Sequence, residues 1–356
     1  MQPINTALCS FGMSGWVFHA PFISVDPHFK LYAVVERTKN LAEKKYQGVK
    51  TFRTLEEMFT DDAIELVIVN TPNYTHYEFV KKALLANKHV IVEKPFTVTV
   101  KEAEELIELA YKKNKKLSVY HNRRYDSDYK TIKKILGEKL LGDLAEAEFH
   151  FDRYSENIGP KLHKETPGPG TGSLYDLGSH LIDQALQLFG MPDAVFADIR
   201  IIRPASKVDD YFDLLLYYPK LRVKIKSSYL VREPLPGYIL HGSKGSFIKP
   251  KTNIQEELLQ ANNVPGRADW GIEPESERGL LHTEKDARLN DEVGQGKVIK
   301  EYISSERGNY GDYNDGMYDA IRNGKPVPVS AEDGLKVIKI IERAVKSNNE
   351  KKVVEL

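Results

Sequence analysis

Hydrophobic and polar positions follow two different patterns along the chain, and the change falls near residue 122. In the first part, short apolar runs alternate with segments of helical spacing. The runs cover residues 4–10, 30–35, 64–70, 89–92 and 117–120. Apolar runs of this length, joined by short helices, are typical of parallel strands buried on both faces. The pattern predicts an α/β fold with a doubly wound parallel sheet, a Rossmann domain.

Helix starts in the first part are marked by two capping boxes. Thr54 is followed three residues later by Glu57, and Thr99 is followed by Glu102. In this arrangement each threonine and its glutamate satisfy free N–H groups of the first helical turn. We therefore expect helices to begin directly after Thr54 and Thr99, and a further helix over residues 74–86.

After residue 122 the strand pattern becomes alternating. Residues 144–152 place Ala147 and Phe149 on one face and Glu148 and His150 on the other, which predicts a half-buried antiparallel strand. Further strands are expected at 195–202, 212–218, 221–230, 237–240 and 298–303, and helices at 128–138, 173–189, 312–323 and 331–347. Residues 158–171 form a Gly/Pro-rich loop that we expect to face the ligand crevice, and 251–296 predict no element. The change of pattern predicts two domains, 1–122 and 123–356. The C-terminal helices are expected to be able to pack back on the first domain.

The turn after the first strand is a variant of the dinucleotide fingerprint G-x-G-x-x-G. It reads Ser10-Phe11-Gly12-Met13-Ser14-Gly15, with serine in the first glycine position. Gly12 would let the backbone approach a pyrophosphate, and Gly15 would let the helix pack on the strand. Glu36, at the end of the second strand, stands where a carboxylate that binds the ribose belongs. A glycine turn after a strand is common, so the fingerprint alone is a weak signal.

The other strand ends should lie in the same crevice, because ligands of doubly wound sheets bind beyond the carboxyl ends of the strands. These ends are Asn70-Thr71-Pro72, Glu93-Lys94-Pro95 and Asn122-Arg123. A lysine at a strand end is usually a surface charge. At this mouth, however, the Lys94 ammonium could orient and polarise a substrate oxygen. For Pro72 and His76, loop shape and helix surface are the plainer interpretations.

A polar stripe on the predicted helix 173–189 is the second candidate site. Asp176, His180, Asp183 and Gln187 are spaced by four, three and four residues, which stacks them on one helix face. Such a stripe is usually solvent-facing. An Asp–His pair one turn apart can also hold an imidazole ready to exchange a proton with an alcohol. HEXXH-type zinc binding is poorly supported, and we predict no metal site.

Composition narrows the class of protein. Lys and Arg equal Asp and Glu, 51 each, so no overall basic field favours nucleic acid or an anionic membrane. The single cysteine, Cys9, excludes an intrachain disulfide and a cysteine cluster. No apolar run approaches a membrane span, and the N-terminus begins as a strand rather than a signal peptide, so we expect a cytoplasmic enzyme.

Three segments together resemble one enzyme family. Residues 10–15 with Phe18-His19-Ala20-Pro21-Phe22, then Glu93-Lys94-Pro95-Phe96, then Asp176-Leu177-Gly178-Ser179-His180 are similar to the Gfo/Idh/MocA oxidoreductases. The segment 18–22 resembles the subgroup of NADP-dependent scyllo-inositol dehydrogenases. The resemblance covers essentially the whole chain. It implies a Rossmann domain followed by an α/β domain with an open, mostly antiparallel sheet, through which members pair as homodimers or homotetramers.

The resemblance also implies hydride transfer between a nicotinamide and a secondary alcohol of a sugar or cyclitol. Lys94 would hold the substrate oxygen, His180 would be the general acid and base, and Asp176 would orient His180 or bind a neighbouring hydroxyl. Asn122, Arg123 and Asp183 would lie close to the substrate. The cofactor-binding residues would be Gly12, Met13, Ser14, Gly15, His19, Glu36, Arg37, Asn70, Thr71, Pro72, His76, Glu93 and Lys94.

Two questions stay open at this stage. Glu36 favours NAD, because a carboxylate repels a 2′-phosphate, whereas Arg37, Thr38 and Lys39 and the subgroup favour NADP. Two other functions are alternatives to a dehydrogenase: a glycosidase that oxidises its substrate transiently with bound NAD, and a non-catalytic NAD(P)-binding sensor. Retention of Lys94, Asp176 and His180 argues against the sensor, and the particular substrate cannot be read from the chain.

Overall fold

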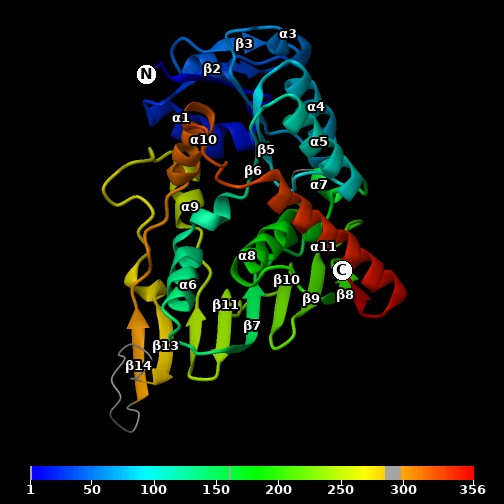
Figure 1. Ribbon diagram of the computed structural model, residues 1–356, viewed down its shortest axis with the longest axis vertical. Helices are drawn as coiled ribbons and strands as arrows, with labels where there is room; N and C mark the ends of the chain where they lie inside the picture. The colour runs from blue at the N-terminus through cyan, green and yellow to red at the C-terminus, as the bar shows by residue number, and fades with distance from the viewer. Residues whose placement is uncertain (1, 160–161, 285–297) are drawn as a thin grey trace. The chain divides into compact units, whose positions relative to one another are not determined.

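The computed structural model describes residues 2–159, 162–284 and 298–356, and divides them into two compact units (Figure 1). The first unit comprises residues 1–122, 255–270 and 309–338, and the second comprises 123–254, 271–308 and 339–356. Positions 160–161 of the loop 158–171 and positions 285–296 of the segment 251–296 lie outside the described residues.

The first unit is built on a parallel sheet with the strand order β3-β2-β1-β4-β5-β6. This is the dinucleotide-binding order, and it confirms the predicted Rossmann architecture. The strands are β1 (Ile4–Leu8), β2 (Phe29–Val35), β3 (Lys50–Phe52), β4 (Leu66–Val69), β5 (His89–Glu93) and β6 (Leu117–Tyr120). All four residues of β4 are buried, as expected for a parallel strand covered on both faces. The short edge strand β3 was not predicted.

Helices of the first unit begin where their capping residues predict. The Thr54 and Thr99 side chains each accept the N–H of the glutamate three residues on, and both reciprocal bonds are present. The helices are α1 (Ala20–Val25), α2 (Leu41–Lys45), α3 (Leu55–Phe59), α4 (His76–Leu85), α5 (Val100–Lys112), α9 (Ile254–Gln260) and α10 (Gly311–Asn323), with short 3₁₀ turns at Asn73–Thr75 and Asn122–Tyr125. The predicted helix 74–86 therefore starts as a 3₁₀ turn.

The later segments complete the core of the first unit. Trp270 and Tyr310 both pack on Phe22, with ring centroids 5.7 and 6.0 Å away. The Tyr313 hydroxyl lies 2.6 Å from the Ser118 Oγ on β6. Helix α11 (Ala331–Glu350) covers the predicted helix 331–347, and the Oγ of the preceding Ser330 accepts the Asp333 N–H.

The second unit is built on an open sheet with the order β14-β13-β12-β11-β7-β10-β9-β8-β15 in its described part. Most pairs are antiparallel, but β7 (Leu144–His150) runs parallel to β10 (Arg222–Ser228). The prediction of an antiparallel strand at 144–152 is therefore wrong for this edge of β7 and correct for its pairing with β11 (Tyr238–Gly242). The side-chain alternation of a half-buried strand is the same in both cases, so it cannot give the direction of a neighbour. The remaining strands are β8 (Ala194–Arg200), β9 (Tyr211–Tyr217), β12 (Gly245–Lys249), β13 (Gly279–Glu284), β14 (Val298–Ile303) and β15 (Val354–Glu355).

One face of this sheet is covered by α8 (Ser179–Phe189), which buries Leu181 and Ala185 completely (Figure 1). The other helices of the unit are α6 (Ser127–Gly137) and α7 (Leu162–Glu165). Strand β13 and helix α9 lie in the segment 251–296, where the sequence predicted no element, and β12, which precedes this segment, was not predicted either. Across the described residues, no helix is both long enough and apolar enough to cross a bilayer.

Candidate active site and dinucleotide-binding turn

In the turn after β1, hydrogen bonds of the Ser10 and Asn70 side chains hold the backbone where the fingerprint has its first glycine. The Ser10 Oγ accepts the Gly12 N–H at 3.2 Å, so the serine closes the turn itself. The Asn70 side chain donates to the Ser10 carbonyl at 2.7 Å and accepts the Ser10 N–H at 3.0 Å. Asn70 was predicted as a cofactor contact. In the structure its amide ties the end of β4 to the dinucleotide turn.

The turn needs glycine at positions 12 and 15 for two different physical reasons. A Cβ on Gly15 would lie 2.5 Å from the Ser10 carbonyl oxygen, so only glycine allows the helix to pack against the strand end. A Cβ on Gly12 would meet only the Ser10 Oγ at 3.4 Å, which leaves room for the approach of a phosphate. Met13, at the tip, is 41% exposed. These residues fit a bound dinucleotide.

The helix after this turn opens with a π-helical segment, Gly15–His19. π-Helical turns occur frequently at functional sites. Ser14, which precedes this segment, and His19, which ends it, both contact one carboxylate. Glu93, at the end of β5, accepts from the Ser14 Oγ at 2.5 Å and contacts the His19 Nε2 at 2.9 Å.

Glu93 is ionised over a wide pH range. Burial alone would raise the pKa of its carboxyl, but His19, Ser14 and the Lys94 charge together lower that pKa to about 2. Lys94 follows directly, half-buried, and the Lys94–Pro95 peptide bond is cis. The carboxylate therefore fixes the strand end that carries the candidate substrate-binding lysine.

His76 connects two of the strand ends. Its Nδ1 lies 2.8 Å from the Pro95 carbonyl and its Nε2 lies 2.9 Å from the Thr71 carbonyl. The side chain is fully buried, and burial lowers the pKa of the imidazole. His76 was predicted as a cofactor contact, with a helix-surface position as the plainer alternative. The structure shows a buried side chain that braces the loops of Thr71-Pro72 and Lys94-Pro95, so the surface alternative is wrong.

Glu36 faces inward. Its two carboxylate oxygens accept the N–H groups of Leu41 and Ala42 at 3.1 and 3.0 Å, at the start of α2. A carboxylate at a helix N-terminus satisfies donors that lack an intrahelical partner. By contrast, Arg37, Thr38 and Lys39 are all exposed. The Arg53 side chain holds the loop of residues 36–39 in place by donating to the Glu36 and Lys39 carbonyls.

In the second unit, the predicted helix 173–189 is interrupted at its start by a π-helical turn, Leu174–Gly178, and continues as α8. Asp209 holds the N-terminus by accepting the Leu174 N–H at 2.8 Å and the Ser173 hydroxyl at 3.0 Å. Gly178 allows the close approach to the sheet, because a Cβ there would lie 2.9 Å from the Leu174 Cδ1 and 3.4 Å from the Phe212 ring.

The two middle residues of the polar stripe on this helix are buried, whereas Asp176 is half-buried and Gln187 is exposed. His180 and Asp183 are 6% and 2% exposed, while Gln187 is exposed. Asp176, in the π-turn, forms an ion pair of 2.8 Å with Lys164 of α7. Burying polar side chains on a helix is costly unless they are paired, so this stripe is unlike an ordinary surface stripe.

Asp183 and Arg123, predicted near the substrate, both form internal ion pairs. Arg124 donates to the two Asp183 oxygens at 2.8 and 2.6 Å. The Arg123 Nη1 donates to Asp126 at 3.1 Å and to the Asn253 Oδ1 at 2.8 Å. Asn122 is buried at the start of the same 3₁₀ turn. These contacts favour a structural role for the Arg124–Asp183 pair.

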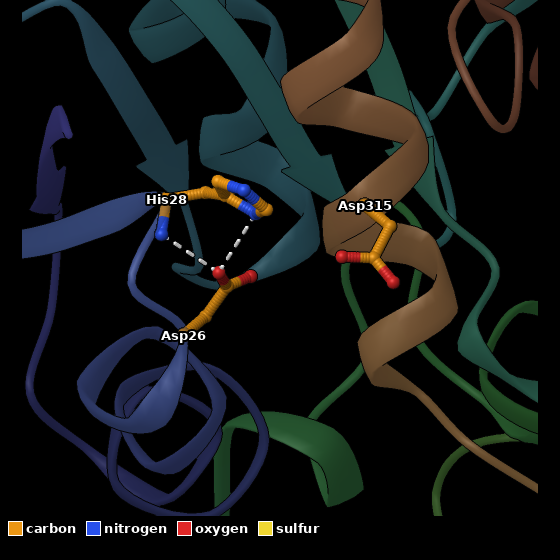
Figure 2. A group of neighbouring side chains, drawn as sticks. All are labelled: Asp26, His28 and Asp315. Atoms are coloured by element: carbon orange, nitrogen blue, oxygen red, sulfur yellow. Dashed lines mark hydrogen bonds and ion pairs between the residues drawn. The ribbon is translucent and has the colours of Figure 1, made fainter. Parts of the chain in front are cut away.

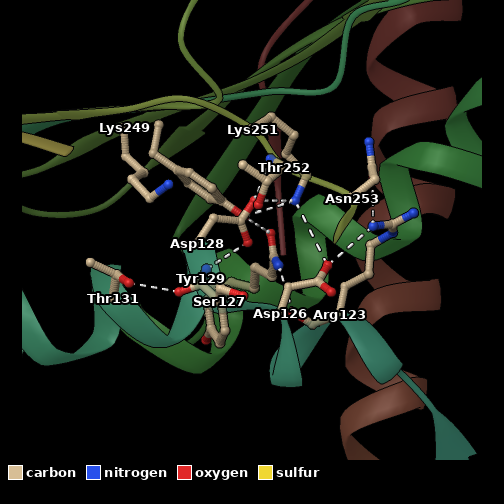
Figure 3. A network of polar contacts seen from close by, with 12 residues as sticks. Arg123, Asp126, Ser127, Asp128, Tyr129, Thr131, Lys249, Lys251, Thr252 and Asn253 are labelled. Carbon is tan, nitrogen blue, oxygen red and sulfur yellow. Dashed lines mark hydrogen bonds and ion pairs between the residues drawn. The ribbon is translucent and has the colours of Figure 1, made fainter. Parts of the chain in front are cut away.

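Figure 3 shows the network around Arg123. Lys251 lies between two carboxylates, 2.8 Å from Asp128 and 4.0 Å from Asp126, and the Thr252 N–H donates to Asp128. Nearby, the fully buried Lys249 pairs with Glu273 at 2.6 Å. The segment 249–253 therefore anchors α6 and the 3₁₀ turn before it.

One group of possible metal ligands occurs within the described residues: Asp26, His28 and Asp315 (Figure 2). Their ligand atoms lie within 4.8 Å of one another, and His28 and Asp315 are exposed. The Asp26 carboxylate already accepts the His28 N–H at 2.9 Å. No contact of these residues with the dinucleotide turn is seen among the described hydrogen bonds and ion pairs, so nothing ties the group to the candidate site.

A Rossmann unit with an adapted dinucleotide turn and a second α/β unit that carries the buried His180 are the features expected of an NAD(P)-dependent oxidoreductase. Residues 4–121 match the family model for the NAD-binding Rossmann fold of the Gfo/Idh/MocA oxidoreductases, and residues 133–356 match the model for their C-terminal α/β domain. The chain belongs to this family, as the sequence resemblance indicated.

Relatives of known sequence or structure match over the full length. The chain is 38% identical to scyllo-inositol 2-dehydrogenase (NADP⁺) IolW of Bacillus subtilis over 100% of this chain and 97% of the relative. A putative oxidoreductase from Bacteroides fragilis is 47% identical with a TM-score of 0.89, covering 99% and 100% of the two chains. The putative oxidoreductase YvaA of Bacillus subtilis is 37% identical with a TM-score of 0.93, covering 99% and 98%.

Two residues of the candidate site were not predicted as such. Lys164 lies in the loop 158–171, where only the loop as a whole was expected to matter, and Tyr229 follows β10. Burial lowers the pKa of the Lys164 ammonium and raises the pKa of the Tyr229 phenol, and the charge of Asp176 raises both pKa values. The Gly/Pro-rich composition gave a signal for the loop, but no spacing rule connects Lys164 or Tyr229 to a helix elsewhere in the sequence.

Proposed function

We propose that this oxidoreductase is an NADP-dependent dehydrogenase of a cyclitol or sugar, acting on a secondary alcohol. The observation that carries the proposal is the burial of His180 on a helix face that begins with the ion-paired Asp176. The name of the relative from Bacillus subtilis, a scyllo-inositol 2-dehydrogenase, supports the same substrate class.

The roles of the residues follow from their chemistry. When bound, the nicotinamide supplies the hydride acceptor or donor. Lys94 would donate a hydrogen bond to the reacting oxygen and stabilise the negative charge that develops on it. The His180 imidazole would take the hydroxyl proton during oxidation and return it during reduction. Glu93 keeps the β5 end in place through Ser14 and His19.

The test is turnover of a polyol and sugar panel, including scyllo-inositol, with NADP⁺ and NAD⁺. Lys94→Ala and His180→Ala should each lower kcat/KM by about a hundredfold or more, the scale of a lost general acid or base. Lys101→Ala and His282→Ala are matched controls, because both side chains are exposed and lie outside the candidate site. If both site variants retain parental turnover on a good substrate, the proposed roles are wrong.

The preference for NADP is proposed from the loop after β2. Glu36 caps α2, and the exposed Arg37 and Lys39 can meet a 2′-phosphate. Arg37→Ala should weaken NADPH binding about tenfold, the value of one charge-assisted hydrogen bond, and leave NADH binding unchanged. Fluorescence titration of both cofactors measures this. Equal losses for NADPH and NADH would contradict the proposal.

We also propose that the protein self-associates through the open sheet of the second unit. Phe196 on β8 and Val298 and Tyr302 on β14 are large apolar side chains with exposed fractions of 36%, 64% and 67%. Burying such residues against a second copy would be favourable. Light scattering of the purified protein should give the mass of a dimer or tetramer. The mass of a single chain at micromolar concentration would contradict it.

A further inference from the structure

The loop that carries Lys164 is anchored by a buried arginine. Arg203, whose side chain is 2% exposed, donates to Asp210 at 2.8 Å, to Glu165 at 3.0 Å and to the Asn157 carbonyl at 2.9 Å. The other Glu165 oxygen accepts the Gly159 N–H at 2.8 Å. Breaking a buried ion pair of this kind is strongly unfavourable, so the residue next to Lys164 is fixed to the sheet.

This anchor places the Lys164 side chain against the π-turn at the start of the candidate active-site helix. Its Nζ lies 2.8 Å from the Asp176 Oδ2. Burial would lower the pKa of the ammonium, but the Asp176 carboxylate more than offsets this and raises the pKa, so the group stays charged. The two side chains are 47% and 22% exposed, so a ligand can reach both members of the pair.

Further polar and aromatic groups surround the pair. Tyr229 is half-buried, and the charges of Asp176 and Lys164 both act on its phenol. The Arg203 guanidinium packs over the Tyr229 ring, 4.6 Å from its centroid, which links Tyr229 to the same anchor as the loop. The pair and Tyr229 therefore form a preorganised polar surface within the second unit.

We infer that Lys164 is a specificity-determining residue, which together with Asp176 binds two neighbouring hydroxyl groups of the substrate and so selects vicinal diols. The inference rests on the proposed polyol dehydrogenase function. An ammonium only donates hydrogen bonds and a carboxylate only accepts them. A hydroxyl does both, so two adjacent hydroxyls can bridge the pair, one oxygen accepting from Lys164 and the other hydroxyl donating to Asp176.

The pair also explains selection against simple alcohols. A simple alcohol offers one hydroxyl to both charged groups, whereas a vicinal diol offers a separate hydroxyl to each and so forms more hydrogen bonds with the pair. Sites built to hydrogen-bond a hydroxyl discriminate strongly against analogues that lack it. Lys164 also neutralises the charge of Asp176. The pair therefore suits a neutral polyol, because the substrate does not have to supply a positive charge for Asp176.

The experiment measures binding and turnover separately. Binding of scyllo-inositol and of a deoxy-inositol lacking one neighbouring hydroxyl is measured by calorimetry on protein saturated with NADPH, a complex in which an alcohol cannot be oxidised. Steady-state kinetics use scyllo-inositol with NADP⁺. The variants are Lys164→Met, Lys164→Arg and, as the matched control, Lys207→Met, because Lys207 is an exposed lysine of the same unit.

Lys164→Met should weaken scyllo-inositol binding and raise KM by about tenfold, the value of one hydrogen bond to a charged group, with kcat changed much less. Lys164→Arg should restore most of the loss, and Lys207→Met should match the parent. The preference of the parent for scyllo-inositol over the deoxy compound should shrink in Lys164→Met. NADPH affinity should be equal in all variants, which shows that they are folded.

Two results would overturn the inference. If Lys164→Met binds scyllo-inositol as the parent does, Lys164 does not select the substrate, and parental turnover then leaves the proposed function standing. If the parent itself binds neither cyclitol in the NADPH complex, the pair is not a diol site. Absence of turnover alone, with binding of scyllo-inositol intact and dependent on Lys164, would contradict the dehydrogenase proposal and support the binding inference.

Discussion

At the scale of single residues, Glu93 decides the local electrostatics of the dinucleotide-binding unit. Its carboxylate accepts from Ser14 and contacts His19, and its pKa is about 2 instead of 4.5. A carboxyl with a depressed folded-state pKa adds stability above its unfolded pKa. That stability is lost as the pH falls from about 4.5 toward 2. The sequence placed Glu93, Ser14 and His19 among the cofactor-binding residues but did not predict that the two partners bond to Glu93.

Glu93→Gln tests this. The variant should be less stable than the parent by up to about 3 kcal/mol at pH 7, the equivalent of the pKa shift. The difference should narrow as the pH falls below about 4.5. Denaturant unfolding at pH 7 and at pH 3.5 measures it. Glu108→Gln, at an exposed carboxylate on α5, is the control and should lie close to the parent at both pH values. A difference that does not change with pH would show that the charge is not responsible.

Gly15 is the residue where the backbone approach is closest. Gly15→Ala should cost about 1–3 kcal/mol, because the new Cβ would lie 2.5 Å from the Ser10 carbonyl and the turn must shift. Gly137→Ala is the matched control, since a Cβ there meets nothing within 4 Å. Thermal unfolding and NADPH titration compare the two. Parental stability and cofactor affinity in Gly15→Ala would contradict the steric argument.

At the scale of elements, the helix starts of the first unit could be predicted because their signals are local. The Thr99 and Glu102 side chains and the N–H groups they bond lie within four residues of one another. The π-turns at Gly15–His19 and Leu174–Gly178 could not be predicted. Their apolar spacing is close to that of an α-helix, so the periodicity gives no sign of the extra residue in a π-turn.

The capping box of α5 gives a prediction at this scale. Thr99→Ala should lower the free energy of unfolding by about 1 kcal/mol, because the Glu102 N–H loses its acceptor. Thr99→Asn should be close to the parent, since asparagine is an equally good N-cap. Urea unfolding of the three proteins measures the difference. Equal stability of the alanine variant and the parent would mean that water replaces the cap at no cost.

At the scale of the whole molecule, the first unit is discontinuous in sequence. Phe22 and Ser118 pack on or bond to Trp270, Tyr310 and Tyr313 from much later in the chain. A boundary at residue 122 is visible from the change in hydrophobic pattern. Residues 255–270 and 309–338 rejoin the first unit through long-range packing, for which the sequence carries no spacing signal.

A fragment of residues 1–122 should therefore fold poorly by itself. It lacks the later segments that cover Phe22 and β6, so apolar surface would be exposed to water. We expect no cooperative thermal transition and weak or no NADPH binding. In the full chain, Trp270→Ala should be destabilising by about 3–5 kcal/mol, as for other buried aromatic side chains, because Trp270 is 1% exposed. A fragment that melts cooperatively and binds NADPH would contradict this.

The sequence by itself determined what depends on neighbouring residues: the strand–helix alternation, the capped helix starts, the glycine turn with Ser10 in place of glycine, and the family motifs at Lys94, Asp176 and His180. Only the tertiary structure decided which groups meet across long sequence distances. In the folded chain the Glu36 carboxylate caps α2, and Asn70 and His76 bond to neighbouring loops. Strands β7 and β10 are parallel, and Lys164 forms an ion pair with Asp176. The physical reason is that hydrogen bonds and ion pairs depend on distance in space, whereas periodicity records only which face a residue occupies.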